Sequence, residues 1–398
     1  MSAPSRAIVT SVIGIGQILA WGSSYYLPTI LAQPVAEETG WPIGWVIGAL
    51  SIGLLVSGLV SPHVGHLIER HGGRPILAAS AVLLAIGLLI QGLAPSLSVF
   101  VFAWLVIGVG MGAGLYDPAF STLTRLFGEN ARSAITQVTL WGGFASTVCW
   151  PLSAFLVERF GWRITSLVYV AINLAIVLPL YWFGVPKEAA QAPVAAGATR
   201  AAPVPKAEQR QNRLLFLTLA VCFTLASVIM TVIAVHLITV LQMRGVSLAT
   251  AVALGMLVGP AQVGARILEA AFGRRHHPIW SLLVSTAAVG IGLATLLGSP
   301  ELIAIGLVLY GGGNGLRSIA RGTVPLAMFG RAGYAVLMGW LALPVLVAQA
   351  ISPSIGDVML RHLDADGLIA ALTVLAALNV AATLLLMPAA LRRGIVSV

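Results

Sequence analysis

Charged residues are scarce in this chain of 398 residues: they make up 9% of it, whereas hydrophobic residues make up 58%. A soluble globular domain carries charge on about a quarter of its residues, so this composition excludes an ordinary soluble protein. Cysteine is scarce too, with two residues, Cys149 and Cys222, both inside apolar stretches. Two cysteines exclude a disulfide framework or a thiol-rich metal centre, and we expect both to pack as small apolar side chains.

Two further absences restrict the function. The sequence has no glycine-rich phosphate-binding loop that would serve nucleotide-driven transport, and the glycines between 108 and 114 follow no strand. We expect those glycines to allow close helix packing. No constellation of metal ligands or of an activated nucleophile is visible, so we expect no enzyme, no cofactor and no bound metal. A membrane receptor would need a sensory domain, and none is visible in the sequence.

Long apolar stretches fill most of the chain. A membrane-spanning helix needs about 20 mostly apolar residues, and we find twelve such stretches, at roughly 8–33, 42–66, 75–94, 97–124, 134–156, 164–184, 214–241, 248–271, 279–298, 301–326, 333–355 and 367–390. Their apolar runs are continuous, whereas barrel strands alternate over about ten residues. The sequence therefore predicts an all-α membrane protein with twelve transmembrane helices in two six-helix bundles.

The positive charge lies mostly on one side of these stretches. Of the 22 lysines and arginines, 15 fall on the side of the N-terminus and 4 on the other side, and the remaining three lie inside helical stretches, at Arg266, Arg317 and Arg321. By the positive-inside rule, both termini face the cytoplasm. We expect a monomer in a lipid bilayer, the bacterial inner membrane, and no nucleic acid partner for the net charge of +9.

One break in composition divides the chain. Residues 186–213 combine small residues with prolines and charges, which predicts a flexible cytoplasmic linker between bundles at 1–185 and 214–398. The two halves echo each other, since the glycine-rich run before Asp117 in the fourth stretch is similar to the run before Arg317 in the tenth. Internal duplication of this kind is typical of secondary transporters whose binding site lies between the halves.

A loop between the second and third stretches carries a family resemblance. It reads Gly65-His-Leu-Ile-Glu69-Arg70-His-Gly72-Gly-Arg74, and it resembles the major facilitator superfamily motif Gly-x-x-x-Asp-Arg-x-Gly-Arg-Lys. The resemblance implies twelve helices, alternating access and a cytoplasmic charge latch that holds one conformation. The latch residues would be Gly65, Glu69, Arg70, Gly72 and Arg74.

The eighth stretch resembles the monocarboxylate porters within that superfamily. It reads Gly259-Pro260-Ala-Gln262-Val-Gly-Ala265-Arg266, where the porters place an acidic residue four positions before an arginine. The resemblance implies that Arg266 anchors a substrate carboxylate. Gln262 stands where the acid would be, so the resemblance carries no proton-coupling acid to this position.

Ionisable residues inside a membrane are expensive and therefore candidates for function. Asp117 is either a titratable group at the cavity that exchanges a proton, a latch partner for Arg70 or Arg74, or a helix-packing aspartate. Arg266 is either an anion anchor, since a guanidinium binds a carboxylate in a bidentate manner, or a structural partner of Glu269 one turn away. Arg317 is expected in the cavity opposite Tyr116.

Polar and aromatic stripes supply the other candidates. Tyr310 and Asn314 share a helical face with Arg317. Gln17, Trp21 and Tyr25 share a face of the first stretch and form either a pocket wall or a packing surface. His236 belongs either to an outer gate or to packing. The predicted function is secondary transport of a small organic anion, with or without coupling to protons; the alternative is efflux of a toxic compound such as a drug or a metalloid.

Overall fold

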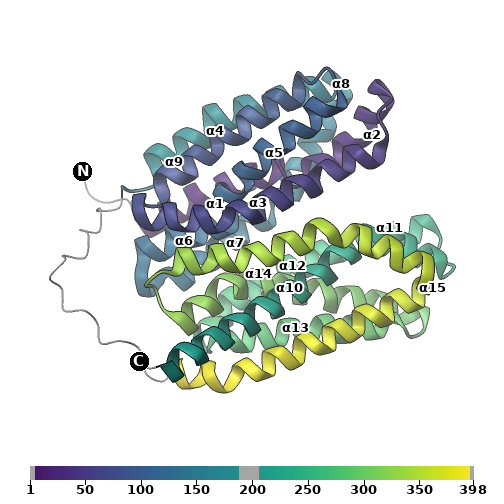
Figure 1. Ribbon diagram of the computed structural model, residues 1–398. Coiled ribbons are helices and arrows are strands. Elements are labelled where there is room, and N and C mark those ends of the chain that lie inside the picture. Colours follow the sequence, from purple (N-terminus) through teal and green to yellow (C-terminus); the bar gives the residue numbers. More distant parts are fainter. Residues whose placement is uncertain (1–4, 188–205, 395–398) are drawn as a thin grey trace.

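The computed structural model describes residues 5–187 and 206–394, and every regular element within these ranges is helical (Figure 1). The elements of the first half are α1 (Arg6–Ser23), α2 (Leu27–Thr39), α3 (Ile43–His71), α4 (Gly73–Gly92), α5 (Leu97–Gly114), α6 (Tyr116–Phe127), η1 (Gly128–Asn130), α7 (Ala131–Gly143), α8 (Ala145–Ile172), η2 (Asn173–Val177) and α9 (Leu178–Gly184). Those of the second half are α10 (Lys206–Met243), α11 (Leu248–Gly255), α12 (Val258–Phe272), η3 (Gly273–Arg275), α13 (Pro278–Leu296), η4 (Pro300–Leu302), α14 (Ile303–Phe329) and α15 (Tyr334–Gly394).

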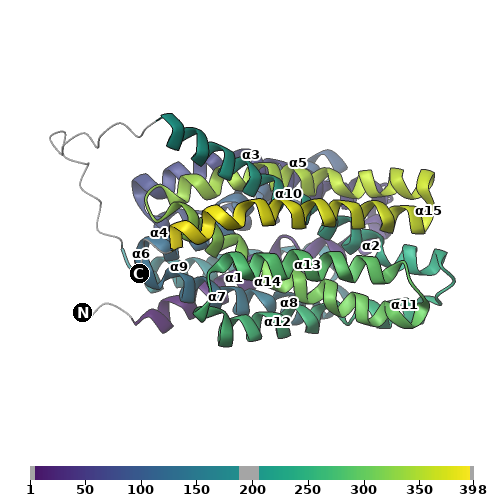
Figure 2. The ribbon, with the colours of Figure 1, turned by 90° about the horizontal axis from the view of Figure 1, so that it is seen from below.

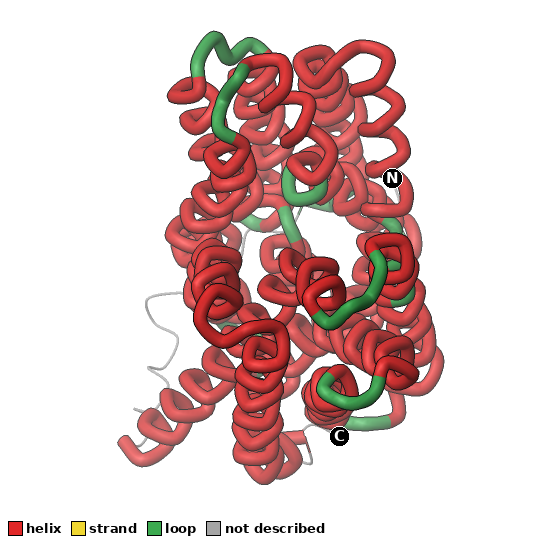
Figure 3. Tube along the Cα trace, turned by 90° about the vertical axis from the view of Figure 1, so that its right-hand side faces the viewer, coloured by secondary structure: helices red, strands yellow, loops and turns green. Residues whose placement is uncertain are grey.

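The helices form two bundles that lie side by side. In Figure 1 the elements α1 to α9 lie above and α10 to α15 below, and the view along the helices in Figure 3 shows the same two groups. Figure 2 shows α10, α13 and α15 of the second bundle running alongside one another. Each bundle has its own apolar core, with Trp104 and Trp162 buried in the first and Leu307 and Leu368 in the second.

Nine helical segments of the described ranges are long and apolar enough to cross a membrane. Two of them are too long for one pass: Leu97–Gly184 has 88 residues and Tyr334–Arg392 has 59. The helical geometry is interrupted at Gly128, Gly161 and Asp364, where φ is 54°, 76° and 57°. Counting these interruptions as turns between passes divides the nine segments into the twelve passes of the sequence-based prediction.

Four passes are also interrupted part-way along their length, which the sequence analysis did not anticipate. The break at Leu115 separates α5 from α6, because Pro118 has no N–H to give to the carbonyl of Gly114. The amide of Gln17, which is fully buried, donates to that carbonyl at 2.7 Å. Gln17 therefore satisfies a backbone group that the interrupted helix leaves open.

The other three interruptions lie in the first, fifth and eighth passes. The chain bends between Ser23 and Leu27, where Pro28 begins α2. It bends again at Phe144, between α7 and α8, and at Met256–Leu257, just before α12. Interrupted helices are typical of the binding-site level in transporters, because their free backbone groups must face protein or water.

The bundles contact each other through glycines that permit close backbone approach. A Cβ atom at Gly65 of α3 would collide with the carbonyl of Ala335 in α15, and one at Gly339 of α15 would collide with the carbonyl of Ser61. Gly322 of α14 lies against the ring of Phe120 of α6. These contacts seal the half of the interface that lies toward Gly72, the end at which α3 turns into α4.

The connection between the bundles was predicted to be a flexible linker over 186–213. Its residues 188–205 lie outside the described residues, and α10 begins at Lys206, eight residues before the expected start of the seventh pass. The start of α10 and the end of α15 lie at the same end of the second bundle, at the left of Figure 1.

Candidate functional site

Asp117 and Arg321 form a buried ion pair between the two bundles. Asp117 lies in the first turn of α6, and Arg321 lies on α14 of the second bundle. The Nε and Nη2 atoms of Arg321 donate to the two carboxylate oxygens of Asp117 at 2.9 and 2.7 Å. The side chains are 13% and 14% exposed. The sequence analysis proposed Asp117 as a titratable group or a partner of Arg70 or Arg74, and it did not anticipate this bidentate partner.

Arg266 lies at the interface between the same two bundles, but it has no carboxylate partner among the described residues. Its Nη1 donates to the carbonyl of Thr139 on α7 at 3.2 Å, and its Nε has no acceptor. Glu269, the structural partner considered from the sequence, instead accepts from Ser281 at 2.7 Å and lies 3.7 Å from Nη2 of Arg132. All residues of α12 are described, and Arg266 alone among them is buried.

Arg317 is a second arginine for which the described residues offer no carboxylate. Its Nη2 lies 2.7 Å from the thioether sulfur of Met230, a weak acceptor, and its Nε has no partner. The two residues predicted to share its face are both buried: the hydroxyl of Tyr310 donates to the carbonyl of Met230 at 3.4 Å, and the amide of Asn314 donates to the carbonyl of Tyr310 at 3.0 Å.

The packing of α12 against α14 places Arg266, Arg317 and Arg321 at similar depths along the helices. Gly311 of α14 lies against the backbone of Val258, and Gly315 lies against the backbone of Gln262. Both helices keep this register, so Arg266 lies at a level between Arg317 and Arg321, which are about 6 Å apart along α14. Arg317 is within electrostatic range of both other guanidinium groups. The structure therefore brings these charges together.

A cluster of aromatic side chains lies beside Arg266. The Trp21 ring is 5.0 Å from that of Tyr116 and 5.3 Å from that of Tyr25, measured between centroids. Tyr26 lies 5.4 Å from Tyr25 and 5.9 Å from Trp150. Arg266 is within electrostatic range of Tyr26 and Tyr116. The sequence analysis named Trp21, Tyr25 and Tyr116 but missed Tyr26, although Pro28 signals the bend that turns Tyr26 inward.

Three predicted site residues have positions that favour packing. Gln17 donates to the carbonyl of Gly114 and accepts from the indole N–H of Trp21 at 3.2 Å, so its amide supports the aromatic cluster. A ring nitrogen of His236 lies 3.0 Å from the carbonyl of Pro353, within the second bundle. The backbone of Gln262 contacts Gly315.

The predicted latch residues gather at the end of α3. Glu69 pairs with Arg125 of α6 at 2.5 Å, and the guanidinium of Arg74 lies 4.8 Å from the centre of the Trp182 ring. Gly72 has a φ of 83°, which favours glycine at the sharp turn into α4. Arg70 is exposed and makes no ion pair with the described residues. The charge pair of this motif therefore lies within the first bundle.

A further contact joins the bundles at the same end. Arg132 of α7 donates to the carbonyls of His276 and Gly273, both at 2.6 Å, where α12 ends. Positive groups at a helix C-terminus satisfy its free carbonyls and its dipole. Arg132 thus connects α7 to the second bundle.

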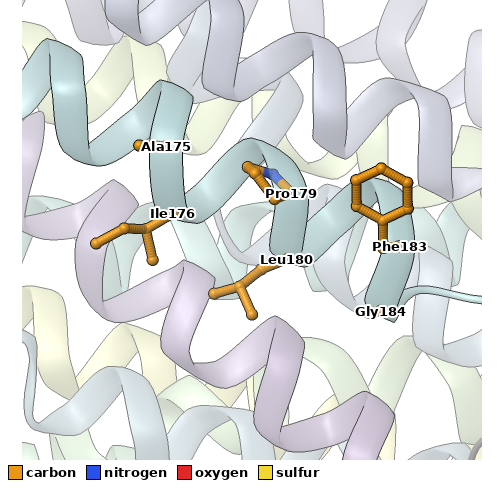
Figure 4. A pocket seen from close by; sticks show the side chains of 6 residues that line it. All are labelled: Ala175, Ile176, Pro179, Leu180, Phe183 and Gly184. Carbon is orange, nitrogen blue, oxygen red and sulfur yellow. The ribbon is translucent and has the colours of Figure 1, made fainter.

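Two surface hollows lie away from the charged and aromatic residues described above. One, on α9 and the turn before it, is lined by apolar side chains and glycine (Figure 4): Ala175, Ile176, Pro179, Leu180, Phe183 and Gly184. Another lies between α10, the end of α14 and the start of α15, and it is lined by Phe216, Phe329, Ala332, Gly333, Val336, Leu337 and Trp340. Neither contains a charged side chain, so both fit contact with lipid better than binding of an anion. The described residues also hold no group of three metal-ligating side chains.

Two helical bundles with buried charges between them define an integral, multi-pass membrane protein. The profile of the Major Facilitator Superfamily matches residues 13–286. The chain therefore belongs to the Major Facilitator Superfamily, which confirms the family and the all-α fold predicted from the sequence. The chain is similar over 98% of its length to the transporter FucP in the outward conformation, with a TM-score of 0.74 and 14% identity, covering 99% of that chain.

Relatives with closer sequences include transporters of organic acids. Monocarboxylate transporter 11 of Mus musculus is 31% identical over 172 residues, which are 40% of this chain and 36% of that protein. The chain thus matches about a third of the length of this relative. The 3-(3-hydroxy-phenyl)propionate transporter of Escherichia coli is 26% identical over 343 residues, which are 83% of this chain and 82% of that protein.

Proposed function

We propose that this protein is a secondary active transporter that moves a small organic anion by alternating access, with Arg266 as the anchor of a substrate carboxylate. The observation that carries the proposal is that Arg266 is the one buried residue of α12 and lacks a carboxylate partner among the described residues. A buried cation without a counter-charge is costly, and a substrate carboxylate would relieve that cost by bidentate pairing.

The surroundings of Arg266 suit an organic acid. The rings of Trp21, Tyr25, Tyr26 and Tyr116 provide apolar area with polar tips, which binds a compact organic body and orients it. The names of the relatives, a monocarboxylate transporter and a transporter of an aromatic propionate, support the same substrate class.

The conformation supports a site reached from one side of the membrane. The contacts of Arg132, of Asp117 with Arg321 and of Gly65 with Ala335 join the bundles toward the end that holds Gly72. We assign this end to the cytoplasm, together with both termini and the linker 186–213, because the basic loops face this side. The bundles 1–185 and 214–398 are then the bodies that rock against each other, and the structure corresponds to an outward-facing state.

Asp117 is the proposed proton carrier. In this state both of its oxygens accept hydrogen bonds from Arg321, so a proton competes with Arg321 for the same carboxylate. Protonation releases Arg321 and loosens the contact between the bundles. Coupling of transport to protons follows from this competition.

The test uses purified protein in proteoliposomes, with exchange of labelled 3-(3-hydroxyphenyl)propionate and of lactate. Arg266→Gln should lower exchange of an accepted acid by roughly tenfold or more, since hydrogen bonds to charged groups contribute about 1.5–3 kcal/mol. Arg275→Gln, at an exposed arginine of η3 just after α12, is the control and should exchange as the parent does. If Arg266→Gln exchanges an accepted acid at the parental rate, or if the parent accepts neither these acids nor a dicarboxylate, the proposal is wrong and efflux assays with drugs and metalloids come next.

Asp117→Asn tests the coupling separately. Exchange should persist in this variant because exchange needs no net proton movement, whereas uphill uptake driven by a proton gradient should be lost. Uphill uptake at the parental level would assign coupling to another group and leave the anion site untouched.

A further inference from the structure

We propose that the substrate carries two anionic groups, one bound by Arg266 and the other by Arg317. This inference rests on the proposed function and specifies its substrate class. The first step is the charge at the level of the site. Three arginines, Arg266, Arg317 and Arg321, share this level with a single carboxylate, that of Asp117, and Asp117 is fully engaged by Arg321.

None of the other carboxylates of the described residues pairs with Arg266 or Arg317. Glu269, the nearest in sequence to Arg266, is held by Ser281 and Arg132. Glu69 pairs with Arg125 on α6, and Glu38 pairs with Arg163. Asp357 and Asp366 pair with Arg361 and Arg244 in the second bundle. The site therefore retains two positive charges inside the protein.

Neither guanidinium is freely exposed, since Arg266 is buried and Arg317 is partly buried. Arg266 is 7% exposed, and the close packing of Gly311 and Gly315 against α12 holds the two helices together at this depth. Arg317 reaches only the sulfur of Met230 with one of its terminal nitrogens. Each guanidinium keeps a buried Nε–H without an acceptor, and such donors are normally satisfied in a folded protein.

Two like charges that are held in proximity without a counter-ion repel each other in a low-dielectric environment. A monocarboxylate neutralises one of them and leaves the other uncompensated. A dicarboxylate neutralises both, and it satisfies donors on α12 and α14 at the same time. The aromatic cluster beside Arg266 fits the body of such a molecule, so aromatic as well as aliphatic diacids belong in the test.

The experiment compares matched pairs of acids that differ by one carboxylate: succinate with butyrate, and phthalate with benzoate. Binding to purified parent, Arg266→Gln, Arg317→Gln and the control Arg275→Gln is measured by calorimetry at pH 7.5, with chloride replaced by a bulky anion. The parent and the control should bind the preferred diacid at one molecule per chain, and about tenfold or more tightly than its partner, which corresponds to about 1.4 kcal/mol. Arg317→Gln should bind both members of the pair equally while still binding the monoacid.

Several results would overturn the inference. One is equal affinity of the parent for diacid and monoacid, and another is a preserved preference of Arg317→Gln for the diacid. The inference also fails if two monoacids bind per chain, or if chloride alone occupies the site. If the parent binds diacid and monoacid equally and both lose affinity in Arg266→Gln, the proposed function stands while the inference of two anionic groups fails. If no acid of either kind binds, the proposed function fails as well.

Discussion

Arg317 and Arg321 lie one turn apart on α14, and they have opposite surroundings. Arg321 meets both oxygens of Asp117 and joins the bundles, whereas Arg317 meets only a thioether. The comparison extends to α12, where Arg266 likewise lacks a carboxylate. The paired Arg321 joins the two halves, whereas the unpaired Arg317 and Arg266, at almost the same depth, are the proposed ligand-binding groups. Substitution of the paired arginine and substitution of an unpaired arginine should therefore have different consequences for stability and for ligand binding.

The largest effect on stability is expected at the paired arginine. Arg321→Ala leaves the Asp117 carboxylate buried and unpaired, which destabilises by about 3–5 kcal/mol in comparable cases. The melting temperature in detergent should fall strongly for Arg321→Ala, and it should recover in the double variant Asp117→Asn/Arg321→Gln. Arg317→Gln is the matched control and should melt at or above the temperature of the parent, because it removes an uncompensated charge. A fall of equal size in Arg317→Gln would remove the distinction between the two arginines.

The next effect concerns the glycines that set the depth of the unpaired arginines. A Cβ at Gly315 would collide with the backbone of Gln262, whereas a Cβ at Gly312 meets only the Cβ of Ala265, at 3.8 Å. Overpacking costs about 1–3 kcal/mol, so Gly315→Ala should lower stability and weaken substrate binding. Gly312→Ala should change both little. Equal melting temperatures and affinities for the two variants would contradict the register between α12 and α14.

A smaller effect is expected at the ion pair of Glu69 with Arg125, which is partly exposed. Partly solvated pairs contribute about 1 kcal/mol or less. Glu69→Gln should slow transport and shift the resting conformation while leaving substrate affinity intact, as measured by distance distributions between spin labels and by calorimetry. Arg70→Ala, at an exposed position, should behave as the parent does. Loss of binding with an unchanged conformation would show that this pair is no latch.

The smallest effect concerns His277, which caps α13 outside the membrane. Its Nδ1 accepts from the N–H of Ile279 at 3.2 Å, and burial, followed by the charge of Arg132, lowers the pKa of His277. A histidine with a lowered pKa contributes stability that is fully present above its unfolded pKa of about 6.5 and is lost as the pH falls through the folded pKa. Acidification below pH about 6.5 should therefore lower the free energy of unfolding of the parent, and with it the melting temperature. His277→Asn, which retains a cap, should lack this component; an identical pH profile would assign the effect elsewhere.

Much of the fold could be predicted from the sequence, because the length of each apolar stretch and the loop motif at 65–74 are local properties of the sequence. Together, these two properties predict a multi-pass protein of this superfamily without knowledge of any tertiary contact. The interruptions near Pro28, Pro118 and Pro260 were also visible in principle, since proline deprives the preceding turn of a hydrogen bond.

The pairing within the site could not be predicted in the same way. Asp117 and Arg321 are 204 residues apart, and the choice between Arg317 and Arg321 depends on how α14 rotates against α6. Glu269 illustrates the same limit: its spacing suggested pairing with Arg266, yet Ser281 of α13 and Arg132 of α7 hold it instead. Long-range packing decides which of several nearby charges meet.

The amide of Gln17 connects two of the interrupted helices. The Nε2 atom of Gln17 donates to the free carbonyl of Gly114, at the break between α5 and α6. Its Oε1 atom accepts from the indole N–H of Trp21 in the aromatic cluster. Asp117 lies three residues beyond that carbonyl, at the start of α6. A change in the tilt of α6 when Asp117 separates from Arg321 is therefore transmitted through one amide to the aromatic cluster. In the proposed transport cycle, the separation of Asp117 from Arg321 and the release of the substrate are therefore expected to be coupled through this amide within the first bundle.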